Sequence, residues 1–183
     1  MENKQNENKI QFNLFISDLT EYNAGNLVGK WFDALTEFDA MSTYINTIAG
    51  KGNEWFISDS ESDLLEVSEF HSIDDIGEMV KVIKKATFDS FVATKIKGEY
   101  ENADIIKCVE NNRVLILDCD VSAFEALGYY EVETSYFEEI RLDNEFISSY
   151  FDFESLGRDL LWSGEYTHIG RDDEHNHIFI INF

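Results

Sequence analysis

The first third of the chain has an alternating pattern that predicts a small antiparallel sheet. Between residues 10 and 16 every second side chain is apolar, which is the period of a half-buried β-strand. Residues 21–26 contain Asn and Gly, which adopt positive φ angles easily, and predict a loop. Residues 27–34 predict a second strand that pairs back on the first, and residues 54–58 predict a third.

Helical spacing appears in the same region and continues beyond it. Apolar residues recur at intervals of three and four over residues 38–48, which predicts an amphipathic helix that ends at the glycines of residues 50–52. Residues 73–83 have the same spacing. Residues 87–97 and 102–109 predict two shorter helices.

The last part of the chain returns to a mixed pattern. Four consecutive apolar residues at 114–117 predict a buried strand, and residues 123–132 and 153–162 predict helices. Residues 166–169 and 177–183 predict a closing hairpin. The sequence therefore predicts an α+β fold of three small domains, in which two α+β domains with antiparallel sheets flank a helical middle domain.

The charge of the chain supports the same division. The protein has 37 acidic and 14 basic residues, a formal net charge of −23. The predicted parts are a disordered N-terminal extension at 1–9, an acidic α+β domain at 10–71 with net charge −9, a near-neutral helical domain at 72–107 with net charge −1, and an acidic α+β domain at 108–183 with net charge −13.

This excess of negative charge belongs to a folded protein. Acidic disordered segments lack aromatic residues, whereas this chain is 44% hydrophobic and contains 15 Phe, 8 Tyr and 3 Trp. Its carboxylates must therefore occupy a folded surface. Solubility is the simplest role for such charge. Carboxylates held in fixed positions can also imitate duplex DNA, which carries one negative charge per ~1.7 Å of its axis.

Targeting signals and cysteine chemistry are not evident. The N-terminus lacks the apolar core of a signal peptide, and no apolar run approaches the ~18 residues of a membrane span. We therefore expect a soluble cytoplasmic protein that has no membrane partner. Two cysteines, Cys108 and Cys119, are more typical of buried, reduced thiols than of a disulfide in that compartment.

Motifs for phosphate or metal binding are incomplete. Residues 25–30 have three residues between their glycines rather than four, and Trp31 stands where a phosphate loop needs Ser or Thr. The acidic run that begins at Asp59 has Leu64 and Phe70 where a calcium loop needs Gly and Glu. Residues 175–177 place two His after three acids, a composition that a surface hairpin explains as well as a metal site.

Catalytic chemistry is not indicated either. With 37 carboxylates, some acidic pairs occur by chance, and four scattered His define no nucleophile and base. Trp31, Trp55 and Trp162 would permit the aromatic cleft of a glycosidase without indicating one. We expect no enzymatic activity, no catalytic residue, no cofactor and no metal.

Several stretches of the chain form a recognisable series. They are LTEYNAG at 19–25, GKWFD at 29–33, EWFISD at 54–59, ALGYYEVET at 126–134 and YFDFESLGRDL at 150–160. In this order over residues 10–183, they resemble the ArdA family of antirestriction proteins. The last two stretches resemble the family's antirestriction motif and its C-terminal aromatic and acidic helix.

The resemblance implies an elongated, curved homodimer of three-domain subunits. It also implies mimicry of the bent DNA that type I restriction–modification enzymes bind, and therefore occupancy of the DNA groove of their methyltransferase–specificity core. Restriction would be blocked, and we expect modification to be blocked as well. The protein would bind no nucleic acid itself. Family members are carried on mobile conjugative elements and shield incoming DNA.

Such inhibition needs charge in the right places rather than chemistry. The candidate phosphate substitutes are carboxylates on loops and outward helix faces. In the first acidic domain they are Glu21, Glu37, Asp39, Asp59, Glu61, Asp63, Glu66 and Glu69. In the last domain they are Asp118, Asp120, Glu131, Glu133, Glu138, Glu139, Asp143, Glu145, Asp152, Glu154 and Asp159.

Other roles stay open for some residues and for the whole chain. Asp33, beside Trp31, and Asp159, beside Arg158, could be structural partners. The Tyr129-Tyr130 segment could belong to the core or to a dimer contact, and we favour packing in the core. The alternative function is an acidic adaptor that binds a basic nucleoid protein or another DNA-binding protein. A carbohydrate-active enzyme is the third hypothesis.

Overall fold

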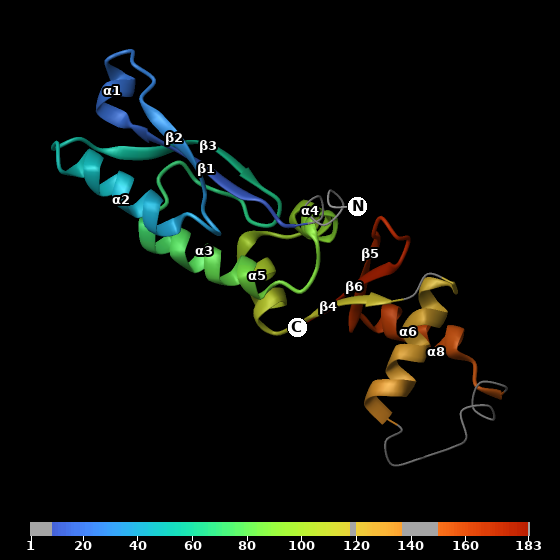
Figure 1. The fold of residues 1–183 in the computed structure, drawn as a ribbon. Coiled ribbons are helices and arrows are strands. Elements are labelled where there is room, and N and C mark those ends of the chain that lie inside the picture. The colour runs from blue at the N-terminus through green and yellow to red at the C-terminus, as the bar shows by residue number, and fades with distance from the viewer. Residues whose placement is uncertain (1–8, 118–119, 137–149, 183) are drawn as a thin grey trace, which may run out of the picture. The chain divides into compact units, whose positions relative to one another are not determined.

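The computed structural model describes residues 9–117, 120–136 and 150–182, and they form two compact units that divide between Glu110 and Asn111 (Figure 1). Both units combine helices with a small antiparallel sheet, so the predicted α+β class is confirmed. Residues 72–107 belong to the first unit. The division into three domains stays a prediction.

The first unit contains a three-stranded antiparallel sheet in the order β2-β1-β3. Its strands are β1 (Phe12–Asp18), β2 (Gly29–Asp33) and β3 (Trp55–Ser62). The helices α2 (Phe38–Ala49) and α3 (Ile73–Lys85) lie on one side of this sheet (Figure 1). All three strands, α2 and α3 were predicted within a few residues of their observed ends.

The core of the first unit follows the predicted alternation. Phe12, Leu14 and Ile16 point from β1 toward the helices and are completely buried. Phe32 of β2 and Met41 of α2 are buried with them. Burying apolar side chains of this size stabilises a fold by about 1.5–3 kcal/mol each relative to leaving them exposed.

A short helix, α1 (Leu19–Asn23), replaces the beginning of the loop predicted at residues 21–26. The buried carboxylate of Asp18 caps it by accepting hydrogen bonds from the backbone N–H groups of Thr20 and Glu21. Asn53 also donates to this carboxylate, and this hydrogen bond lowers the pKa of Asp18. The loop prediction was therefore wrong at its start, because a cap favours helix even where Asn and Gly follow.

Two further helices complete the first unit. They are α4 (Ser90–Glu99) and α5 (Asn102–Glu110). The helix predicted from residue 87 begins at Ser90, because Asp89 caps it by accepting from the N–H of Val92. The α4 helix is tied to the end of β3, where Lys97 Nζ donates to the Ser62 carbonyl at 2.7 Å.

The second unit has a sheet in the order β4-β6-β5, packed with two helices. Its strands are β4 (Val114–Leu117), β5 (Tyr166–Arg171) and β6 (His177–Ile181), and its helices are α6 (Ala123–Glu131) and α8 (Phe153–Ser163). A π-helical turn, η1 (Val132–Tyr136), follows α6. The strand predicted at 114–117 is present, but it is a half-buried edge strand rather than a buried one, and Ile116 is exposed.

The two helices of the second unit approach each other through glycines. An added Cβ at Gly128 of α6 would lie 2.0 Å from the carbonyl oxygen of Phe153, and one at Gly157 of α8 would lie 1.8 Å from that of Phe124. Both contacts are with backbone atoms, which cannot rotate away. Only glycine fits at these two positions.

Two histidines, His168 of β5 and His177 of β6, lie next to each other on neighbouring strands. His177 is buried, and its Nδ1 lies 3.2 Å from Nε2 of His168. The Nε2 atom of His177 lies 3.1 Å from the carbonyl oxygen of Val121 and 3.4 Å from the guanidinium of Arg171. His168 is exposed overall, but its ring packs against those of His177 and Phe179. The partial loss of water around the ring and the adjacent His177 lower the pKa of His168.

This pair predicts that the second unit loses stability in mild acid. A folded-state pKa of His168 below the unfolded value of roughly 6.5 means that the unfolded chain takes up the proton first. Its stabilising contribution is complete above that pH and falls as the pH drops from 7 to 5. We expect the His168→Gln variant to show a smaller fall in the urea midpoint over this interval. An equal fall in both proteins would contradict the assignment.

Candidate protein-binding surface

The side of the first sheet that faces away from α2 and α3 presents both rings and carboxylates. Phe15 of β1 pairs in register with Trp31 of β2 and with Asp59 of β3. Two register positions along, opposite Asn13, Asp33 and Glu61 lie on the same face of their strands as Trp31 and Asp59. We call the surface formed by Phe15, Trp31, Asp33, Asp59 and Glu61 the outer face.

A β-bulge brings two of these carboxylates to the outer face. The pairing of β1 with β3 shifts between Phe15 and Ile16, because Ser58 is an extra residue in β3. Without the shift, the alternation of the strand would turn Asp59 and Glu61 toward the buried core. Both side chains are instead exposed.

Within the described part of the chain, none of the eight predicted carboxylates of the first unit forms an ion pair. Lys30, one of the two bases of residues 10–71, lies over the Phe32 ring at 4.6 Å from its centroid. The ion pairs described in the first unit use acids of its helices: Lys81–Glu78 at 2.6 Å, Lys85–Glu110 at 3.9 Å and Lys107–Asp104 at 2.8 Å.

Exposure to solvent separates these eight residues into two groups. Asp63 is half-buried and has a structural role, because it accepts from the Gln11 N–H and from Ser90 Oγ. Glu21, also half-buried, accepts from Asn26. The remaining six are exposed: Glu37, Asp39, Asp59, Glu61, Glu66 and Glu69. Of these, Glu37 accepts from the Asp33 N–H and Glu61 from the Asn13 amide.

In the second unit, Glu131 differs from the other described candidates. Its carboxylate is 9% exposed and accepts a hydrogen bond from the Tyr166 hydroxyl. Burial and this carboxylate raise the pKa of Tyr166. Glu131 therefore joins α6 to β5 and is not part of the exposed surface proposed below.

The remaining candidates of the second unit are exposed where the structure describes them. Asp152 caps α8 by accepting from the Ser155 N–H, and the hydrogen bonds from Ser155 lower its pKa. Glu154 pairs with Arg158 at 3.0 Å. Also exposed are Asp120, Glu133 and Asp159, whereas Asp118, Glu138, Glu139, Asp143 and Glu145 lie outside the described residues, as does Cys119.

The structure gives the contacts of three positions whose roles the sequence left open. Asp33 accepts from the Leu35 N–H and from the Thr36 hydroxyl, which fixes the turn after β2. Arg158 pairs with Glu154 rather than with its neighbour Asp159. The Tyr129 ring stacks on Phe153 with centroids 4.0 Å apart, which fits the packing role.

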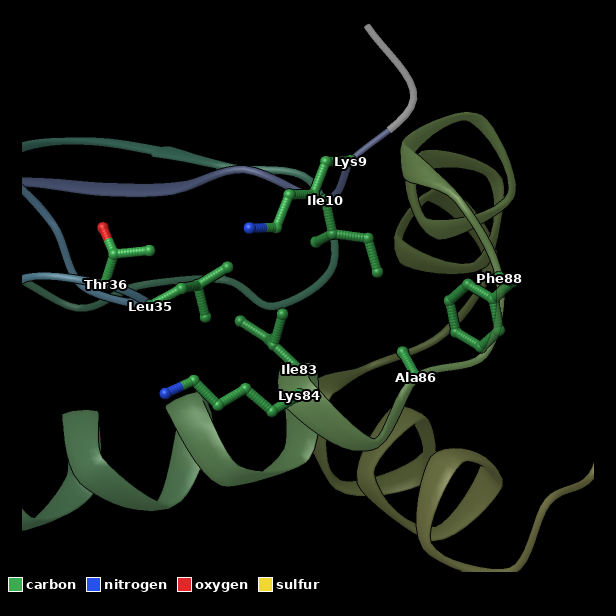
Figure 2. Close-up of a pocket in the computed structure, with 8 residues that line it drawn as sticks. All are labelled: Lys9, Ile10, Leu35, Thr36, Ile83, Lys84, Ala86 and Phe88. Carbon is green, nitrogen blue, oxygen red and sulfur yellow. The ribbon is translucent and has the colours of Figure 1, made fainter. Parts of the chain in front are cut away.

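A pocket of about 470 Å³ lies elsewhere in the first unit, at the C-terminal end of α3 and the start of β1 (Figure 2). The eight lining residues drawn are Lys9, Ile10, Leu35, Thr36, Ile83, Lys84, Ala86 and Phe88, and none is acidic. The candidate carboxylates therefore form a surface rather than the wall of this pocket.

The described residues form neither a metal centre nor a membrane span. His175 lies in the turn before β6, and no three His, Cys, Asp or Glu side chains come together to hold a metal ion in the described ranges. Within the same ranges, no helix has both the length and the apolar character needed to cross a bilayer.

Sequence reasoning missed the aromatic part of the outer face. Phe15 breaks the alternation of residues 10–16, because it is apolar at a position on the polar side of the strand. An off-phase aromatic next to a second strand with Trp31 was the available signal. Pairing between the two could be seen only once the register was known.

Within the described residues, the exposed carboxylates of residues 10–71 thus form an anionic surface without ion pairs. The sequence model of the family described as antirestriction protein (ArdA) matches residues 14–172, which cover most of both units. The chain therefore belongs to the ArdA family of antirestriction proteins. No curated protein matches it.

Proposed function

We propose that the protein inhibits type I restriction–modification enzymes by mimicking bent duplex DNA. Its exposed carboxylates take the place of phosphates in the DNA groove of the methyltransferase–specificity core, so that both restriction and modification are blocked. The active form in this proposal is a homodimer. Membership of the ArdA family supports the antirestriction role.

The observation that most supports the mimicry proposal is the distribution of ion pairs. Lys81, Lys85 and Lys107 pair with acids of residues 72–110, whereas the exposed carboxylates of residues 10–71 form no ion pair in the described structure. A groove that binds DNA provides Lys and Arg for phosphates. Unpaired carboxylates at fixed positions can occupy the same cations at little reorganisation cost.

Competition with DNA tests this proposal. We expect the protein to displace a target duplex from a type I methyltransferase at about one inhibitor dimer per DNA site. Displacement should weaken steeply between 50 and 200 mM salt, because carboxylates release the same counterions that phosphates release. The measurement is fluorescence anisotropy of the labelled duplex, titrated with the protein at several salt concentrations.

Other outcomes of the same titration have distinct meanings. Loss of the duplex itself, or inhibition at trace ratios of protein to enzyme, would mean catalysis. Binding to the methyltransferase without displacing DNA would contradict mimicry and favour the acidic adaptor. An affinity that salt leaves unchanged would point to an apolar interface.

A further inference from the structure

The outer face has the composition of a site for an arginine side chain. We propose that Trp31, supported by Phe15, stacks against an arginine guanidinium of the partner protein, while the neighbouring carboxylates Asp33 and Asp59 attract its charge. This inference rests on the proposed function only in that the partner is a basic protein. It adds an anchor that recognises one type of side chain to a surface that otherwise works through distributed charge.

The first support for this anchor is the fixed position of Phe15. An added Cβ at Gly29 would lie 2.5 Å from Cε1 of Phe15 and 2.8 Å from the hydroxyl oxygen of Ser17. The Phe15 ring therefore occupies the space above Gly29 on the neighbouring strand. Because a glycine lets the ring lie across the sheet, its position is set before any partner binds.

The second support is the arrangement of Trp31 against this ring. The two ring centroids are 5.4 Å apart with an interplanar angle of 62°, an edge-to-face contact. Trp31 is nevertheless 40% exposed. The indole is thus held on one side by Phe15 and open to solvent on another, and Trp is the aromatic residue that attracts cations most strongly.

The third support is the charge around the indole. Asp33 lies two residues along β2, and Asp59 lies across β1, so carboxylates are present in two directions from Trp31. Within the described residues neither forms an ion pair. The nearby base Lys30 lies over Phe32, whose side chain is buried on the other face of the sheet. Asp33 is half-buried and its two oxygens accept from Leu35 and Thr36, so its charge is held in place, whereas Asp59 is exposed. The outer face therefore offers a ring and fixed negative charge to a cation that another molecule must supply.

Arginine fits this site better than lysine. Its planar guanidinium stacks on an aromatic face while its N–H groups point outward in the plane toward carboxylates. The ammonium group of lysine is more strongly hydrated and cannot stack in this way. The site should therefore distinguish two cations of equal charge, which distributed carboxylates alone would not do.

The first experiment changes the ring of Trp31 within the full-length protein. We expect Trp31→Leu to weaken binding to the type I methyltransferase about tenfold, or ~1.4 kcal/mol, and to leave the slope of affinity against salt unchanged. Trp31→Phe, which keeps an aromatic face, should retain most of the affinity. Trp162→Leu is the matched control, because Trp162 is 76% exposed on α8, and it should have little effect. Circular dichroism checks that each variant is folded.

The second experiment needs no restriction enzyme. Octa-arginine and octa-lysine peptides have the same charge, and their binding to the protein is measured by calorimetry. We expect the wild type to prefer octa-arginine, and this preference to shrink in Trp31→Leu but not in Trp162→Leu. No preference in the wild type, or equal shrinkage in the two variants, would overturn the anchor. A protein that keeps the preference but fails to compete with DNA would instead refute the proposed function alone.

Discussion

Replacing Gly157 by alanine is expected to unfold the second unit. The new Cβ would meet the carbonyl oxygen of Phe124 at 1.8 Å, so α8 would have to move away from α6. That movement would disrupt the contact around Leu127, which belongs to the buried core of the unit. We expect a loss of about 3 kcal/mol or more, at the upper end of overpacking effects. Urea unfolding followed by circular dichroism measures the loss.

The same substitution at Gly98 provides a matched control. Gly98 lies in α4 of the first unit, and a Cβ there would meet no atom within 4 Å. Alanine at an open helical position is expected to stabilise by roughly 0.5–1 kcal/mol. Hydrogen exchange should place the effect of Gly157→Ala within residues 111–182. A Gly157 variant as stable as the Gly98 variant would show that the two helices are not packed through this glycine.

Neutralising three unpaired acids is expected to have the largest effect on binding. The triple variant Asp59→Asn, Glu61→Gln and Glu69→Gln removes exposed carboxylates that have no cation partner in the described structure. Each exposed charge pair with the groove contributes about 0–1 kcal/mol. We therefore expect roughly ten- to a hundredfold weaker competition with DNA, together with a shallower dependence on salt.

A second triple variant changes the net charge by the same amount. Glu78→Gln, Asp104→Asn and Glu110→Gln remove acids that pair with lysines inside the protein. We expect no more than about a threefold change in binding. Equal losses in both triple variants would show that net charge alone matters. If one member of the first triple by itself abolished inhibition in a folded protein, distributed mimicry would be wrong.

Most secondary structure was predictable, because it depends on nearby residues. The alternation at residues 10–16 and the spacing at 38–48 place β1 and α2. Errors occurred where one polar side chain changed the local choice, as with the cap of Asp18 at α1 and that of Asp89 at α4. Such caps are specific hydrogen bonds, which apolar periodicity does not report.

The surface was less predictable, because the sequence identifies acids but not their surroundings. The residue pattern indicated exposed carboxylates in both outer parts, and six of the eight named in the first unit are exposed. It could not show that Asp63 holds Ser90 or that Glu131 accepts from Tyr166, since these partners are 27 and 35 residues away.

By itself, the sequence determined the α+β class, the order of the elements, the large negative charge and its absence from residues 72–107. These features follow from composition and from periodicity among residues that are close in the sequence. The tertiary structure alone decided which carboxylates face outward and which rings lie beside them. A single inserted residue, Ser58, turns Asp59 and Glu61 away from the core, and the register of β1 with β2 brings Phe15 to Trp31. Strand register depends on contacts between distant segments, so it exists only in the folded chain.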